Sequence, residues 1–156
     1  MAISFFLVIV AKMGSSGQIT SALQSWAAAK FGADARVEQL KRLSGGASQE
    51  TWAFAVQTAG GTRPMILRRA PGGESKARSS EAIGLGMEAQ LLSKAADAGV
   101  PVPPVLGVSE AGSALGQAFI MDRISGETIG RKILRDEEFD KARSLLAAQC
   151  GRALAG

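Results

Sequence analysis

Residues 43–69, LSGGASQETWAFAVQTAGGTRPMILRR, decide the fold, because they predict three short antiparallel strands joined by glycine-rich bends. Residues 51–56 (TWAFAV) are rich in strand formers, and residues 65–67 (MIL) form an apolar run that ends in two arginines. Gly60 and Gly61 between these runs are a hairpin signal. The first bend, residues 44–48, carries paired glycines that let backbone N–H groups approach a phosphate closely.

The remaining sequence predicts the elements that complete this sheet and cover it. Residues 81–98 predict a helix with one apolar stripe, for which Gly99 is the C-cap. Residues 70–80 (APGGESKARSS) predict an exposed loop. We therefore predict an α+β fold in which a five-stranded antiparallel sheet packs against this helix. The other elements are helices at residues 19–31 and 136–155, and strands at residues 37–43, 105–109 and 118–123.

The N-terminal segment is apolar but short. Residues 2–11 (AISFFLVIVA) fall below the roughly 20 residues that a membrane-spanning helix needs, so we predict no membrane span. A secretory signal would need positive charge ahead of the apolar run, and that charge is missing. Met13 followed by Gly14 suggests an internal start, so residues 1–14 are interpreted as an apolar leader or an over-extended start.

Composition narrows the class of protein. A chain of 156 residues permits one domain, and its net charge of +4 comes from basic residues that are spread along the chain without a long run. This pattern disfavours nucleic-acid binding. The one cysteine, Cys150, cannot form an intramolecular disulfide, which fits a reducing, cytoplasmic compartment. The absence of histidine from the sequence excludes histidine as a general base or metal ligand within it.

Four blocks in order, LSGGASQETW, MILRRAP, MEAQLLSKAADAGVPVPPVL and QAFIMDRISGETI, resemble the N-terminal half of aminoglycoside-phosphotransferase-type small-molecule kinases. They cover residues 39–129 and look most like the subgroup associated with acyl-CoA dehydrogenases. The resemblance implies a protein-kinase-like N-lobe over residues 15–123, with ATP and Mg²⁺ as cofactors. It also implies a small-molecule hydroxyl as the phosphate acceptor.

The resemblance assigns the glycine-rich bend to the terminal phosphates of ATP. Gly45, Gly46 and Ala47 would contact them through backbone N–H groups, and Ser48 would add its hydroxyl. The structural alternative for the bend alone is an ordinary hairpin turn.

By the same resemblance, Arg68 occupies the position of the phosphate-pairing lysine on the third strand, and Glu88 that of its partner glutamate on the helix. Arginine departs from the family pattern there, but a guanidinium can bind phosphate bidentately. Arg69 is the competing candidate, although strand alternation sends it to the opposite face of the sheet. Glu81 is the alternative to Glu88, and an ordinary solvated helix face is the structural reading of either glutamate.

Residues 121–124 (MDRI) resemble the hinge of such kinases, where adenine pairs with backbone atoms. The carbonyl of Asp122 and the N–H of Ile124 would bind the base, with Met121 beside it. An edge strand that enters a loop is the structural alternative. The expected apolar lining is Leu43, Ala55, Ile66 and Val105.

No catalytic or metal-binding residue is assigned, because the sequence lacks the HGD-type loop of this family. Residues 124–156 are interpreted as the hinge and first helix of an incomplete C-lobe, so the chain alone is expected to be inactive. The apolar face of the helix at residues 136–155 predicts self-association. The alternative from another class is a non-catalytic nucleotide-sensing or protein-interaction module.

Overall fold

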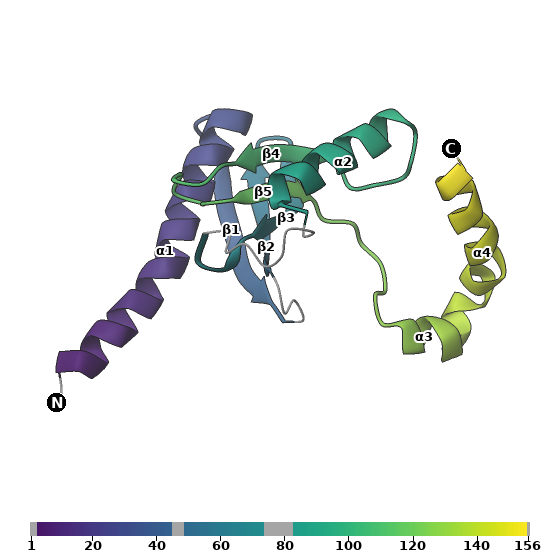
Figure 1. Ribbon diagram of the computed structural model, residues 1–156, viewed down its shortest axis with the longest axis horizontal. Coiled ribbons are helices and arrows are strands. Elements are labelled where there is room, and N and C mark those ends of the chain that lie inside the picture. Colours follow the sequence, from purple (N-terminus) through teal and green to yellow (C-terminus); the bar gives the residue numbers. More distant parts are fainter. Residues whose placement is uncertain (1–2, 45–48, 74–82, 156) are drawn as a thin grey trace.

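The computed structural model describes residues 3–44, 49–73 and 83–155, with side chains from residue 16 onward. The predicted five-stranded antiparallel sheet is confirmed, and its strand order is β1-β2-β3-β5-β4 (Figure 1). The strands are β1 (Arg36–Leu43), β2 (Glu50–Thr58), β3 (Gly61–Arg69), β4 (Val105–Ser109) and β5 (Ala118–Asp122).

Helix α1 (Ile3–Phe31) covers one face of the sheet and builds the larger core. Ile19, Leu23 and Ala27 recur at a spacing of four residues and are buried. They pack with buried side chains of the three central strands, Phe54, Val56, Met65, Leu67 and Ile120. Apolar contact between elements this far apart in the sequence stabilises the whole lobe.

Helix α1 is longer than the helix expected at residues 19–31, because it continues back to Ile3. The residues interpreted as a leader therefore form its first turns, which extend beyond the sheet in Figure 1. Their apolar run has no proline and is compatible with helix. At the other end, the side chain of Gln24 joins α1 to β1: its amide donates to the Ala35 carbonyl at 2.7 Å and accepts from the Val37 N–H at 2.9 Å.

Helix α2 (Leu85–Asp97) covers part of the opposite face. Leu85 and Ala89 are buried against Phe119 and Ala70. The helix was expected at residues 81–98, of which 81 and 82 lie outside the described residues. It ends at Asp97 with Ala98 as its C-cap, and Gly99, which was expected as the C-cap, is the next residue, with a φ of 82° in the left-handed region.

Strand alternation gives the sheet two chemically different faces. On β3, Met65, Leu67 and Arg69 point toward α1, whereas Ile66 and Arg68 point toward the α2 side. Cross-strand partners share a face, so the register extends this division over the neighbouring strands.

The C-terminal part comprises α3 (Gly130–Arg135), a short 3-10 turn η2 (Glu137–Phe139) and α4 (Asp140–Ala155). The single helix expected at residues 136–155 therefore begins later, and α3 was not predicted. Glu127 caps the turn before α3 by accepting the N–H groups of Thr128 and Ile129, each at 2.8 Å. Within these three elements no described residue is buried, and α4 stands apart from the sheet in Figure 1.

Among the described residues, no helix is long and apolar enough to cross a membrane.

Candidate functional site

Arg68 is the centre of a polar cluster on the α2 side of the sheet. Its guanidinium donates from Nη1 to Glu88 Oε1 in the first turn of α2, and from Nη2 to Gln49 Oε1 just before β2. The guanidinium carbon stands 5.7 Å from the centroid of the Phe119 ring on β5. Side chains from α2, from the residue before β2 and from β5 therefore surround the guanidinium of Arg68, and the expected ion pair between Arg68 and Glu88 is confirmed.

This ion pair is accessible to solvent. The side chain of Arg68 is 32% exposed and that of Glu88 is 27% exposed. An ion pair with this much exposure contributes little to folding stability. A guanidinium that is held in place and still open on one side is instead suited to binding an anion.

The sheet surface next to Arg68 is apolar. In the register, Leu43 lies opposite Thr51 and Thr51 opposite Arg68, so Leu43 shares the face of Arg68. By the same argument, this face carries Ala55, Ile66, Val105 and Met121. The four residues expected as apolar lining therefore lie on the same face as Arg68, where a flat apolar ligand could bind beside the guanidinium.

The chain leaves the sheet at the expected hinge. The N–H of Asp122 donates to the Pro104 carbonyl and the N–H of Arg123 to the Pro64 carbonyl, both at 3.1 Å. Ile124 follows with 66% of its surface exposed, and among the described residues its N–H finds no acceptor. Among the described residues that follow β5, the first backbone N–H left open to a ligand is thus that of Ile124. The side chain of Asp122 instead lies on the α1 face, which it shares with Met65.

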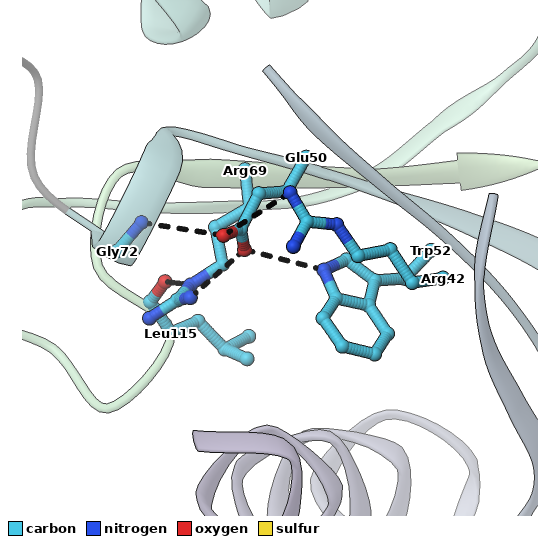
Figure 2. Close-up of polar contacts among 6 residues, drawn as sticks. All are labelled: Arg42, Glu50, Trp52, Arg69, Gly72 and Leu115. Atoms are coloured by element: carbon cyan, nitrogen blue, oxygen red, sulfur yellow. Dashed lines mark hydrogen bonds and ion pairs between the residues drawn. The ribbon is translucent and has the colours of Figure 1, made fainter. Parts of the chain in front are cut away.

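A second polar cluster lies on the α1 face of the same strands (Figure 2). Glu50 Oε2 accepts from Arg69 Nη1 at 3.1 Å and from Trp52 Nε1 at 3.3 Å, while Arg69 Nε donates to the Leu115 carbonyl at 2.7 Å. The other oxygen, Glu50 Oε1, accepts the Gly72 N–H at 3.4 Å and lies 3.7 Å from Arg42 Nη2. This Glu50–Arg69 cluster ties the end of the β2–β3 pair to two loops.

The Glu50–Arg69 cluster is more deeply buried than the Arg68–Glu88 pair, since both side chains are 12% exposed. Burial disfavours the charge of Glu50, but the hydrogen bonds from Trp52, Arg69 and Gly72 outweigh it, so the pKa of Glu50 is lowered. The carboxylate is therefore ionised and occupied by protein donors. We interpret this cluster as structural.

Some expected site residues fall outside the described residues. These are Gly45, Gly46, Ala47 and Ser48 of the glycine-rich bend, and Glu81, the alternative partner of Arg68. Within the described ranges there is no group of three or more histidine, cysteine, aspartate or glutamate side chains that could hold a metal ion.

Sequence reasoning missed two partners of Arg68. Gln49 follows the glycine-rich bend directly, and its position next to a predicted phosphate loop is a signal that could have identified it. Phe119 has the same strand parity as Met121, so alternation could have placed it on the site face.

The five-stranded sheet carries Arg68 on one face, and α2, which carries Glu88, packs on that face. This arrangement is that of a kinase-like N-lobe. The family model described as "Phosphotransferase enzyme family" matches residues 39–156, and the chain belongs to this family. The match does not distinguish the subgroup associated with acyl-CoA dehydrogenases. Comparisons with curated proteins and with solved structures found no match.

Proposed function

We propose that the α2 face of the sheet is the ATP site of a kinase that phosphorylates a hydroxyl of a small molecule. The observation that carries this proposal is the Arg68–Glu88 pair, which presents a fixed and partly exposed guanidinium beside an apolar sheet surface. Family membership supports phosphoryl transfer as the reaction class. The proposal names the phosphate acceptor only by class, as a small molecule that carries a hydroxyl.

In this proposal Arg68 binds the phosphates of ATP. Gln49 occupies one arm of its guanidinium, so a phosphate oxygen would replace the Gln49 amide oxygen as acceptor. The glycine-rich bend, Gly45 to Ser48, would supply backbone N–H groups to the terminal phosphates. Glu88 holds the guanidinium in place from the other side.

The adenine ring would bind at the other end of the same face. Ile66, Val105 and Met121 offer apolar contact, and the Ile124 N–H offers a donor beside the Asp122 carbonyl. An aromatic base with one edge read by backbone atoms fits a pocket that is mostly apolar with a few polar groups.

Mg²⁺ belongs to this proposal as a cofactor of the reaction, where it neutralises charge on the phosphates. We assign no described residue to it. We propose that these 156 residues alone bind the nucleotide without turning it over, with affinity for ATP that is nearly independent of Mg²⁺.

A non-catalytic nucleotide-sensing module is the second candidate. The observation that favours it is arginine at position 68, where similar kinases place lysine. Such a module would bind ATP on the same face and would use the nucleotide as a signal. Turnover of ATP by any protein that contains this sequence would exclude it.

The proposed site can be tested with methyl resonances, because sequence neighbours face opposite sides of the sheet. Ile66 and Met121 lie on the proposed adenine face, whereas Met65 and Ile120 lie in the core under α1. We expect ATP to shift the methyl signals of Ile66 and Met121 and to leave those of Met65 and Ile120 nearly in place. Equal shifts on the two faces, or none at saturating ATP, would contradict the proposal.

We also propose that the chain self-associates through α4. Leu145, Leu146 and Leu154 are 43%, 47% and 89% exposed there. Exposed apolar side chains on a helix favour contact with another protein surface. Replacing Leu145 and Leu146 with glutamine should lower the apparent mass in size-exclusion chromatography, while Leu134→Gln in α3 serves as a control. A wild-type chain that stays monomeric at every concentration would contradict this expectation.

A further inference from the structure

Arg63 and Asp122 form a two-pronged ion pair directly before the chain leaves the sheet. Arg63 Nε donates to Asp122 Oδ1 and Arg63 Nη2 to Asp122 Oδ2, both at 2.7 Å. Asp122 is the last residue of β5 and lies opposite Met65 on β3. Arg63 is two residues before Met65 on the same face, so its side chain reaches Asp122 diagonally across the two strands.

The ion pair adds to two backbone contacts at the same point. The Asp122 N–H is held by Pro104, which precedes β4, and the Arg123 N–H is held by Pro64 within β3, each at 3.1 Å. Pro64 lies next to Arg63, so the side-chain pair and the Arg123 bond connect the same short part of β3 to the same two residues. The chain is therefore fixed from both sides immediately before Ile124.

Arg63 has a further contact on α1. Its guanidinium carbon lies 6.0 Å from the centroid of the Phe31 ring, and hydrogen bonding to Asp122 raises the pKa of Arg63. Beside these residues a cavity of about 210 Å³ separates the β2–β3 hairpin from α1, with Phe31, Val56, Met65 and Arg63 in its lining. Arg63 is therefore held at two points, by Asp122 at the end of β5 and by Phe31 at the end of α1.

The pair cannot serve by touching the nucleotide proposed above. Asp122 shares the α1 face with Met65 and Arg63, whereas Met121 and Ile66 face the proposed adenine position. Its effect on a ligand must therefore pass through the backbone of residues 122–124.

We propose that Arg63 is a positioning residue for this hinge. By holding Asp122, it fixes the Asp122 carbonyl and the Ile124 N–H at the spacing that a base such as adenine requires. The inference rests on the proposed function for the identity of the ligand, but the fixed hinge itself can be measured without a ligand. Preorganised backbone groups bind more tightly because they lose less freedom on binding.

The first arm of the test measures amide hydrogen exchange of the whole chain without ligand. Arg63→Gln removes both the positive charge and the two-pronged contact with Asp122, whereas Arg63→Lys keeps the charge but loses the two-pronged contact. Arg36→Gln is the matched control, since Arg36 is an exposed arginine that donates to the Ala33 and Ala35 carbonyls at the α1–β1 turn. We expect faster exchange at the Arg123 amide in both Arg63 variants and no change in the control. An unchanged Arg123 amide in folded Arg63→Gln protein would overturn the proposal.

The second arm compares adenosine and ATP as ligands of the same variants. A hinge effect acts on the base, so Arg63→Gln should weaken adenosine and ATP by the same factor, about fivefold, or roughly 1 kcal/mol. Loss of ATP binding alone would contradict a role at the hinge. If the wild-type chain binds neither ligand, the proposed function fails while the exchange measurement still decides whether Arg63 fixes the hinge.

Discussion

Arg68 and Arg69 are neighbours on β3 with the same side chain, yet they occupy opposite faces and different surroundings. Arg69 is 12% exposed, and its guanidinium is engaged by Glu50 and the Leu115 carbonyl. Arg68 is 32% exposed, and its partners Glu88 and Gln49 leave it open to solvent. One residue type thus supports the fold on one face and is available to a ligand on the other.

The two arginines differ in how exposed their side chains are and in the groups that bind them. Glu50 is surrounded by donors from Arg69, Trp52 and Gly72, so its charge is compensated inside the protein. Such a cluster becomes costly when one member is removed, because the others keep their buried charge or unpaired donors. Glu88 lies at the start of a helix with solvent access, and removing it leaves an arginine that water can solvate.

The largest expected effect is therefore on folding stability. It should be much larger for a substitution of Glu50 than for a substitution of Glu88. Glu50→Ala should lower the free energy of unfolding by about 3 kcal/mol, because it leaves the guanidinium of Arg69, which is only 12% exposed, without its carboxylate partner. Glu88→Ala should lower it by less than about 1 kcal/mol. Urea denaturation of both variants measures the contrast. Equal losses of unfolding free energy would show that the Glu50–Arg69 cluster stabilises the fold no more than the Arg68–Glu88 pair does.

The pH dependence of stability should come from the same Glu50–Arg69 cluster. Folding lowers the pKa of Glu50 below its ordinary value of 4.5, so its contribution is present above that value and is lost as pH falls through the lower, folded pKa. The difference in unfolding free energy between wild type and Glu50→Gln should therefore be constant from neutrality down to pH 4.5 and should shrink over the range below that value. A difference that stays constant over this range in urea titrations would argue against an ionised, compensated Glu50.

A smaller effect is expected at Gln49, and it concerns ligand binding. Replacing Gln49 with glutamate puts a second carboxylate against the Arg68 arm that the phosphate is proposed to take over. ATP affinity should fall about tenfold, roughly 1.4 kcal/mol, and adenosine affinity should not change. Gln57→Glu, in β2, is a control for the added charge. Unchanged ATP affinity in Gln49→Glu would mean that this arm of the Arg68 guanidinium does not bind phosphate.

Much of this arrangement could be predicted from the sequence. Strand alternation alone separates Arg68 from Arg69, and the apolar runs around Gly60 and Gly61 define the hairpin that carries both. The pairing of Arg68 with Glu88 followed from the family resemblance and is present in the structure.

The missed contacts depend on strand order and register. β5 lies between β3 and β4, so Arg63 meets Asp122 across 59 positions of sequence, and nothing local in either segment indicates that they meet. The Glu50–Arg69 cluster likewise needs the β2–β3 register and two separate loops. In the C-terminal part, Asp136 looked like the start of one helix, but the chain first forms α3 and a 3-10 turn.

The central claim is that Arg68 binds the phosphates of ATP while the hinge backbone at residues 122–124 binds the adenine base. One calorimetric experiment tests this claim most directly. ATP and adenosine are titrated into the wild-type chain, into Arg68→Ala and into the control Arg36→Gln. The wild-type dissociation constant for ATP is expected on the order of 1 mM, about 4 kcal/mol of binding free energy. In Arg68→Ala, we predict that ATP binding weakens about fivefold, roughly 1 kcal/mol, while adenosine binding does not change. Equal weakening of both ligands, or an unchanged ATP affinity, would contradict the account.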